Sequence, residues 1–313
     1  MKHGLFLWAL LFAVIHVKAQ NTQTFIYKGN VFQSFVVPTT GWYLLDASGG
    51  QGGASGYYNL GPNYCDPGVP YQGGKGARLQ GYVRLEAGDS LRIAVAGAGG
   101  NGGAYELLLS GGPYCPTVVS GGGGGGASSI VKVNGSVYTP LLFAAGGGGA
   151  SNKPSCYIWM PDCFPPPYAS DGNGKPGLAT LEGESSFEGR CGNWDPINGG
   201  KNGHGGAGSD NDDFGGAGGA GYYTDGWTHY AEGGQYNGTL YSYGGQAYLS
   251  GNYGGNSGQA GGDGGWGGGG EGGFTIDDRS WDCNATIEAW AGTNATGGGG
   301  GGGWNGGAGG GFN

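Results

Sequence analysis

The chain has 313 residues, of which 83 are glycine, and its formal net charge is −9. Glycine destabilises a helix interior by roughly 1 kcal/mol relative to alanine, so this composition excludes a mostly helical domain, a coiled coil and a transmembrane bundle. The glycines form uneven clusters such as Gly121 to Gly126, without the regular spacing of collagen. The acidic charge argues against nucleic acid and acidic membranes as partners.

The first 19 residues have the features of a secretory signal peptide. Met1 to His3 is positively charged, Leu5 to Val17 is apolar, and Val17-Lys18-Ala19 provides the cleavage site. The apolar run is shorter than the roughly 20 residues that span a bilayer, and no later stretch approaches that length. We therefore expect residues 1–19 to be removed and the protein to be secreted and extracellular.

Phe25 to Val37 and Trp42 to Ala47 are the first two expected strands, on either side of a Pro-Thr-Thr-Gly turn. Alternation with a period of two then predicts a strand over 79–85, with its leucine and valine side chains on one face. After the turn Glu86 to Asp89 the alternation resumes over 91–95. We expect these last two strands to form a hairpin with one apolar face.

Asn134-Gly135 predicts a second hairpin, because this dipeptide supplies the positive φ angles of a type I′ turn. Its strands are expected over 130–133 and 136–139. Leu141 to Ala145 is a continuous apolar run, typical of a strand buried on both faces. Tight turns and the lack of an amphipathic helix predict an all-β fold, an antiparallel sandwich or jelly roll, over 20–150.

The polyglycine runs predict a second kind of order. Chains without Cβ atoms pack side by side as left-handed helices with three residues per turn, whose N–H and C=O groups point towards neighbouring chains. Such groups are satisfied only when several runs bond laterally. A flexible linker is the alternative. Flexible linkers are rich in serine and poor in aromatic residues, whereas Trp266 and Trp304 interrupt these runs. We expect bundled polyglycine helices over 199–313, after a Pro- and Cys-containing insertion over 151–198. The runs at 121–126, 146–149, 267–270 and 297–303 are the candidates to lie together.

Six cysteines in a secreted chain predict up to three disulfide bonds. Free thiols or bridges between chains are the alternative. Cys156 and Cys163 enclose a short loop and are the first pair we expect to be bridged; the others are Cys65, Cys115, Cys191 and Cys283. Four Asn-x-Ser/Thr sequons predict a glycoprotein if the source is eukaryotic, at Asn134, Asn237, Asn284 and Asn294.

Two stretches of the sequence resemble a known family. The run from Gly73 to Gly97 and the run from Gly121 to Gly149 are similar to the glycine-rich extracellular domain of the anaplastic lymphoma kinase and leukocyte tyrosine kinase receptors. The resemblance covers most of 31–150 and is compositional after that. It implies a tumour-necrosis-factor-like sandwich from which bundled polyglycine helices emerge. The chain lacks the transmembrane helix, epidermal-growth-factor-like module and kinase of these receptors, so their signalling function does not transfer.

Motifs for chemistry are few. Gly205 to Asp210 resembles the start of a calcium-binding nonapeptide repeat, and Asp210, Asp212 and Asp213 offer oxygen ligands. There is one copy rather than an array, so a solvated acidic loop is the preferred interpretation and calcium the lesser one. The sequence has no phosphate-binding loop, and His204 and His229 lack the context of a catalytic triad. We expect no enzyme activity and no cofactor.

Three classes of function fit these features. The first is a secreted structural protein of an extracellular matrix such as a cuticle, a capsule or a biomineral layer. Its expected partners are other matrix proteins, polysaccharide or a mineral surface. The second is a soluble extracellular ligand-binding module. The third is an ice- or surface-binding protein, which is less favoured because the regular Thr or Ala ladders of an ice-binding face are not evident.

Overall fold

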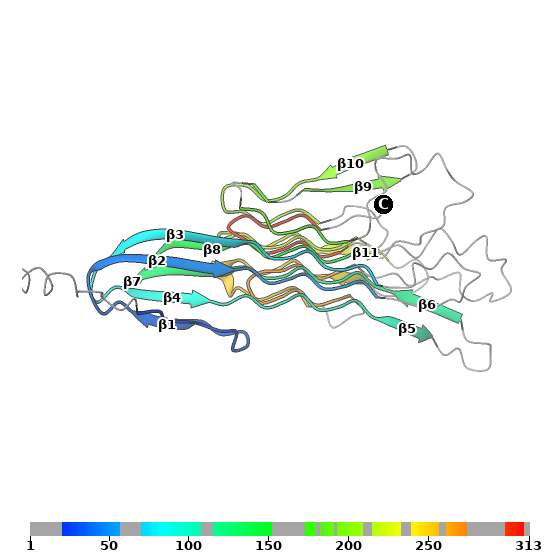
Figure 1. Ribbon diagram of the computed structural model, residues 1–313. Helices are drawn as coiled ribbons and strands as arrows, with labels where there is room; N and C mark the ends of the chain where they lie inside the picture. Colours follow the sequence, from blue (N-terminus) through cyan, green and yellow to red (C-terminus); the bar gives the residue numbers. More distant parts are fainter. Residues whose placement is uncertain are drawn as a thin grey trace, which may run out of the picture.

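The computed structural model describes residues 21–56, 70–107, 115–151, 173–179, 182–183, 185–190, 193–208, 215–232, 239–256, 261–273 and 298–309. These residues form strands, one short 3-10 helix and long glycine segments, and the strands pair in antiparallel sheets (Figure 1). The predicted all-β class is therefore confirmed for the described residues. The strands are β1 (Gln33–Val36), β2 (Gly41–Ser48), β3 (Arg78–Leu85), β4 (Ser90–Ala94), β5 (Ala104–Leu107), β6 (Cys115–Val119), β7 (Ser128–Asn134), β8 (Val137–Ala144), β9 (Ser186–Arg190), β10 (Asn193–Ile197), β11 (His229–Glu232) and β12 (Thr239–Ser242), and the helix is η2 (Tyr248–Ser250).

Two sheets share the main apolar core. One has the strand order β1-β4-β7-β8, and the other consists of β2 and β3. Alternation places apolar side chains of each sheet on the face towards the other, where their burial is the main stabilising contribution. The core consists of Val37, Leu45, Leu85, Leu91, Ile93 and Ile130, with Phe25, Phe35, Tyr43, Val83, Val95, Leu141 and Leu142 packed around it.

The expected hairpin of the third and fourth strands is wrong. β3 pairs with β2, whereas β4 pairs with β1 and β7, so the turn over 86–89 crosses from one sheet to the other. Gly88 adopts φ +90° there. The Asp89 carboxylate accepts a hydrogen bond from the Glu86 N–H (2.9 Å) and pairs with Lys132 (2.7 Å). Period-two alternation is the same for two strands paired in one sheet and for two strands in facing sheets, so it did not distinguish the two arrangements.

The second hairpin is confirmed, with its turn shifted by one residue. β7 and β8 pair, and Asn134 lies opposite Val137, so the turn is Gly135-Ser136 and not Asn134-Gly135. Gly135 has φ +60° and Ser136 has no positive φ, which is the pattern of a type II′ turn rather than the expected type I′. The expected strand at the start of the chain is also shorter, because Gly29 turns the chain at φ +85° and β1 begins at Gln33.

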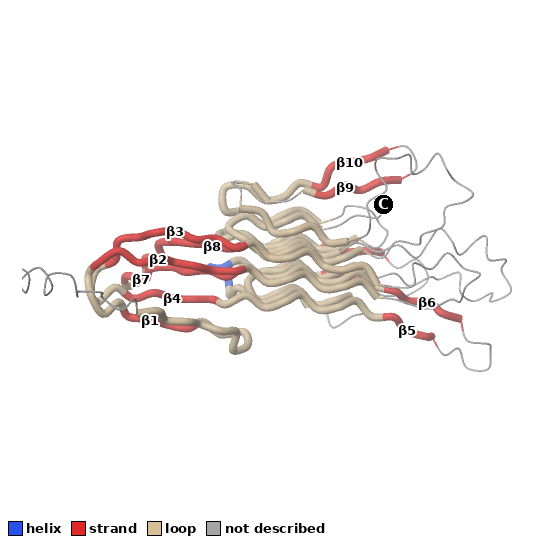
Figure 2. Tube along the Cα trace, viewed as in Figure 1, coloured by secondary structure: helices blue, strands red, loops and turns tan. Residues whose placement is uncertain are grey.

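The glycine segments run side by side beyond the two sheets, as the tan tubes of Figure 2 show. Segment 121–126 bonds every N–H and C=O group to another segment, at N···O distances of 2.7 to 3.1 Å. The partner segment changes at each residue and returns at every third one. Gly121 and Gly124, for example, both donate to one segment, at Gly273 and Gly270. Three neighbours accept its N–H groups, within 97–100, 147–150 and 270–273, and three donate to its C=O groups, within 50–53, 262–265 and 299–302.

These contacts leave no room for a side chain at most glycine positions inside the bundle. A Cβ atom added at Gly124 would overlap the carbonyl oxygen of Gly300, and most other glycines of the bundle would meet a neighbouring carbonyl in the same way. Aromatic residues instead lie where the glycine segments meet the outer face of the four-stranded sheet. Tyr222 stacks on Trp304 with ring centroids 5.0 Å apart, and the Arg92 guanidinium lies 3.4 Å from the centre of the Phe32 ring.

Candidate functional site

Most of the sites expected from the sequence lie outside the described residues. This is so for the signal peptide, for Asp210, Asp212 and Asp213, for Asn237, Asn284 and Asn294, and for the predicted Cys156–Cys163 bridge. Cys65, Cys191 and Cys283 also lie there, and Cys115 is described only as backbone of β6. Asn134 is exposed at the end of β7, where a glycan would be accessible. Within the described ranges, no group of three His, Cys, Asp or Glu side chains is placed to hold a metal ion.

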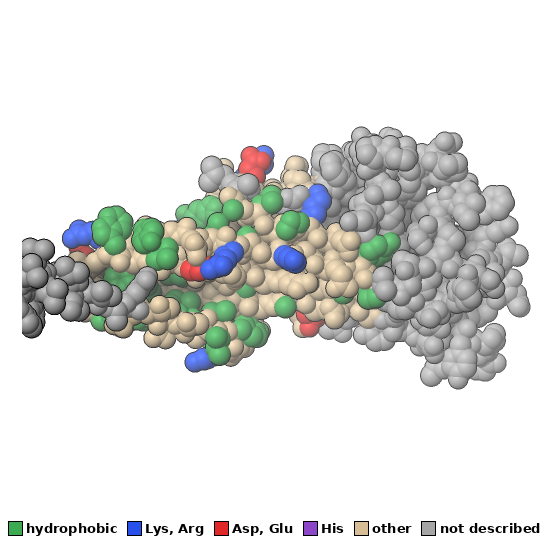
Figure 3. Space-filling model, in the orientation of Figure 1, with side chains coloured by type: hydrophobic (Ala, Val, Ile, Leu, Met, Phe, Trp, Pro, Cys, Tyr) green, Lys and Arg blue, Asp and Glu red, His purple; other side chains and the backbone are tan. Residues whose placement is uncertain are grey.

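The outward face of β2 and β3 is the most distinctive exposed surface of the described part of the chain. Trp42 is 71% exposed, Tyr82 is 73% exposed and Leu44 is 41% exposed. Large aromatic side chains are usually buried, and exposed apolar patches mark interaction sites. Figure 3 shows hydrophobic side chains gathered over this sheet beside acidic and basic ones. We call this surface the β2–β3 face.

Strand register determines the order of side chains on the β2–β3 face. Successive outward residues of a strand are two positions apart, so the face has four rows separated by about 7 Å. Two rows carry the aromatic and apolar groups, and the other two are polar. The opposed residues, in order along β2, are Trp42 and Arg84, Leu44 and Tyr82, Asp46 and Gln80, and Ser48 and Arg78.

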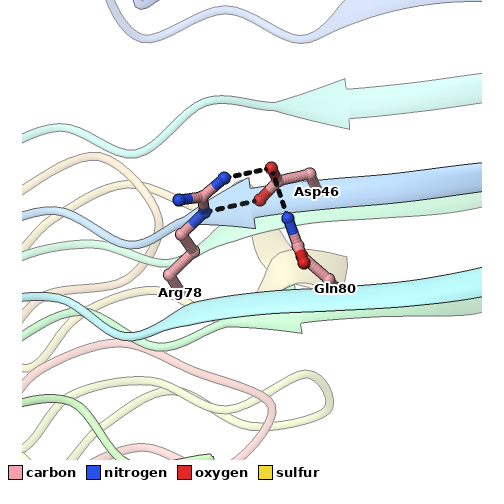
Figure 4. A network of polar contacts seen from close by, with 3 residues as sticks. All are labelled: Asp46, Arg78 and Gln80. Atoms are coloured by element: carbon pink, nitrogen blue, oxygen red, sulfur yellow. Dashed lines mark hydrogen bonds and ion pairs between the residues drawn. The ribbon is translucent and has the colours of Figure 1, made fainter.

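A polar network occupies one end of the β2–β3 face (Figure 4). The Arg78 guanidinium donates two hydrogen bonds to the Asp46 carboxylate, at 3.0 and 2.6 Å, and the Gln80 amide donates a third, at 2.9 Å. The bonds from Arg78 and then Gln80 lower the pKa of Asp46 to about 2, because they favour the charged form. The pKa of Arg78 is raised in turn by its bond to Asp46. The network therefore holds three planar polar groups in fixed positions at neutral pH.

Arg84 differs from Arg78 because it has no acidic partner among the described residues. It lies opposite Trp42 at the aromatic end of the face. Its guanidinium is thus open to a ligand that lies on the aromatic rows. The β2–β3 face combines stacking surfaces with fixed donors and acceptors. In the sequence its residues alternate with the inward-facing residues of β2 and β3. The sequence alone does not reveal this site, because Trp and Tyr at alternate positions of a strand are equally compatible with a buried face of the sheet.

A concave surface lies between β8 and the glycine segments. Its volume is about 470 Å³, and much of its lining is glycine backbone from 146–149, 174–177 and 298–301. Lys175 and Glu182 also line it, but the Lys175 ammonium donates to the Ser185 carbonyl at 3.0 Å, and Glu182 pairs with Lys201 at 3.3 Å. With its charged side chains bonded within the protein, this groove offers fewer groups for recognition than the β2–β3 face.

Comparison with known proteins gives no match to a protein-family model and no similar curated protein. The part of the chain that the structure describes contains no helix with the length and hydrophobicity needed to cross a membrane.

Proposed function

We propose that the chain is a secreted, non-enzymatic, glycine-rich structural protein of an extracellular matrix. The observation that carries this proposal is the hydrogen bonding of segment 121–126, which is bonded to six neighbouring segments at once. A bundle held by backbone groups in every lateral direction is stiff and keeps few side chains for chemistry. These are the properties of a scaffold.

The finer architecture is part of the same proposal. A partner that changes at each residue and returns at every third is expected of a helix with three residues per turn, so the pattern supports bundled polyglycine helices. The two facing sheets are compatible with the tumour-necrosis-factor-like sandwich or jelly roll that the receptor resemblance implies. In this arrangement the sandwich holds one end of the bundle, and the polyglycine helices extend from it.

A soluble extracellular binding module is the second candidate, and the exposed β2–β3 face favours it. Both candidates use the same scaffold, so they differ in abundance and location rather than in fold. The outward side chains of the β2–β3 face are mixed rather than a regular ladder of Thr or Ala, so they add nothing to the ice-binding alternative.

Fractionation of the source material tests the proposal. A matrix protein should resist extraction in buffer and appear among peptides released by denaturant or acid from the insoluble or mineralised fraction. Recovery of the protein entirely in the buffer-soluble fraction would contradict the structural function and favour the binding module.

A further inference from the structure

We propose that the β2–β3 face binds an extended, uncharged polysaccharide chain lying along the strands. This inference deepens the proposed function, on which it rests, by naming the matrix component that the protein contacts. The face has what a sugar chain requires: exposed aromatic rings for the flat C–H faces of the sugars and fixed polar groups for their hydroxyls.

The aromatic rows provide the stacking positions. Trp42 and Tyr82 are diagonal neighbours across the strand pair, because Trp42 lies opposite Arg84. Diagonal neighbours in an antiparallel pair are about 7–8 Å apart, so two rings and Leu44 form one continuous apolar strip without covering each other. A sugar ring that lies on each aromatic side chain removes apolar surface from water on both partners.

The polar rows continue in the same direction. Asp46 still has lone pairs available to hydroxyl donors, and the Arg78 side chain is 65% exposed. Since Arg78 and Gln80 already hold the carboxylate in place, binding costs little side-chain entropy at this end. Arg84 adds donors beside Trp42 at the other end.

The size and charge of the face favour this ligand over others. Eight outward side chains in a narrow strip are far fewer than the roughly 20–30 residues that each side of a stable protein interface uses. The net charge of −9 repels a polyanion at long range, which disfavours an acidic polysaccharide. An uncharged polysaccharide does not need such a large interface, and the acidic protein does not repel it.

The test measures depletion of the secreted full-length protein by particles of cellulose, chitin and β-1,3-glucan, and by alginate and heparin beads, at low and at high salt. We expect saturable binding to at least one of the uncharged polysaccharides, and little effect of salt because no charge is neutralised. Trp42→Ala and Tyr82→Ala should each weaken this binding by about tenfold, and the double variant should abolish it. Trp227→Ala is the matched control, because Trp227 is also exposed (56%) but belongs to a glycine segment.

Three results would overturn the inference. These are no binding to any uncharged polysaccharide, equal binding by the Trp42→Ala, Tyr82→Ala double variant with an unchanged melting temperature, and binding confined to alginate or heparin and lost at high salt. The inference and the proposed function fail separately. If the protein is found in the matrix but does not bind these particles, only the proposed ligand is refuted. If it binds the particles but is absent from the matrix, only the structural function is refuted.

Discussion

At the scale of single residues, the exposed Asp46 carboxylate shows how two neighbours fix a charge on an open surface. Arg78 and Gln80 donate three hydrogen bonds to it, and none of these groups is buried in the core. The alternation of β2 and β3 places Asp46 and Gln80 directly opposite each other, with Arg78 one row further along. The arrangement therefore depends on strand register alone.

We predict that Asp46 titrates with a pKa of about 2, below its ordinary value of 3.8. Because the folded pKa is lowered, its contribution to stability is present above pH 3.8 and is lost as the pH falls towards 2. NMR of the side-chain carboxyl carbon measures this pKa directly. Arg78→Gln should return it towards the ordinary value, whereas Lys201→Gln, which removes a cation paired with Glu182, should leave it unchanged. An Asp46 midpoint near 4 in the unmodified protein would show that the network is not formed in solution.

At the scale of elements, the sequence predicts strands well where apolar alternation meets a core. It identified β2, β3, β4, β7 and β8. It also identified the apolar run 141–145 as a strand with contacts on both faces, since Leu142 packs in the main core and Phe143 against the aromatic cluster. The sequence indicated two separate strands, over 136–139 and 141–145, whereas the structure has the single strand β8, in which Leu141 is an extra residue between the partners of Ile130 and Val131. Alternation reports which face of a strand is buried but not which strand it pairs with, so the crossing at 86–89 was missed.

The short pairs β5–β6, β9–β10 and β11–β12 were not expected from the sequence either. In these strands glycine, proline and charged residues interrupt any apolar period, for example Pro116, Gly189 and Pro196. β5 follows the glycine segment 97–103 and β6 precedes segment 121–126, and the lateral hydrogen bonding between these segments continues into the two strands. Their pairing is a property of neighbouring chains in the bundle, which a local sequence window does not contain. The candidate site was missed for a related reason, because exposure of Trp42 and Tyr82 depends on what covers the sheet.

We predict that single alanines in the glycine bundle act according to the space at each position. Gly124→Ala places a Cβ on the Gly300 carbonyl and should destabilise the protein by about 1–3 kcal/mol, with roughly 2–4 °C of melting temperature lost per kcal/mol. Gly148→Ala is the matched control. Its Cβ would lie 3.5 Å from the nearest atom, the backbone nitrogen of Lys175. Alanine should therefore be neutral, or stabilising by about 0.4–1 kcal/mol because it lowers the conformational entropy of the unfolded chain. Thermal unfolding followed by circular dichroism distinguishes the two, and equal melting temperatures would refute the packed bundle.

At the scale of the whole molecule, the glycine bundle joins distant parts of the chain. Segment 121–126, from the part expected to be a sandwich, exchanges hydrogen bonds with 262–265, 270–273 and 299–302 near the end of the sequence. The two parts are interleaved, so neither buries its backbone groups alone.

This interleaving predicts that residues 20–150 do not fold stably when produced alone. Six of the twelve hydrogen bonds of segment 121–126 come from residues after 150 and would be lost. We expect the truncated chain to be degraded or retained during secretion, whereas the full chain is secreted. A truncated protein with a cooperative unfolding transition and an unchanged melting temperature would contradict the prediction.

Secretion also reports on the main core. Ile93 is only 5% exposed between the two sheets, so Ile93→Asp buries an unpaired carboxylate and should abolish secretion of the folded protein. Val36→Asp makes a comparable change at a position of β1 that is 62% exposed, and it should be secreted at the normal level. The amounts of both variants in the culture medium, measured by immunoblot, test the assignment of the core. Normal secretion of Ile93→Asp would refute it.

Because the hydrogen-bond partner changes at each residue and returns at every third, each glycine segment has a fixed three-residue phase. Deleting one glycine from 121–126 turns every later N–H group towards the wrong neighbour, whereas deleting three shifts the segment by one full repeat and lets each group meet a carbonyl of its former partner. Length changes in the bundle should therefore be tolerated in multiples of three residues, and other length changes should destabilise the protein. Natural variation in the lengths of these runs would then preserve phase rather than length.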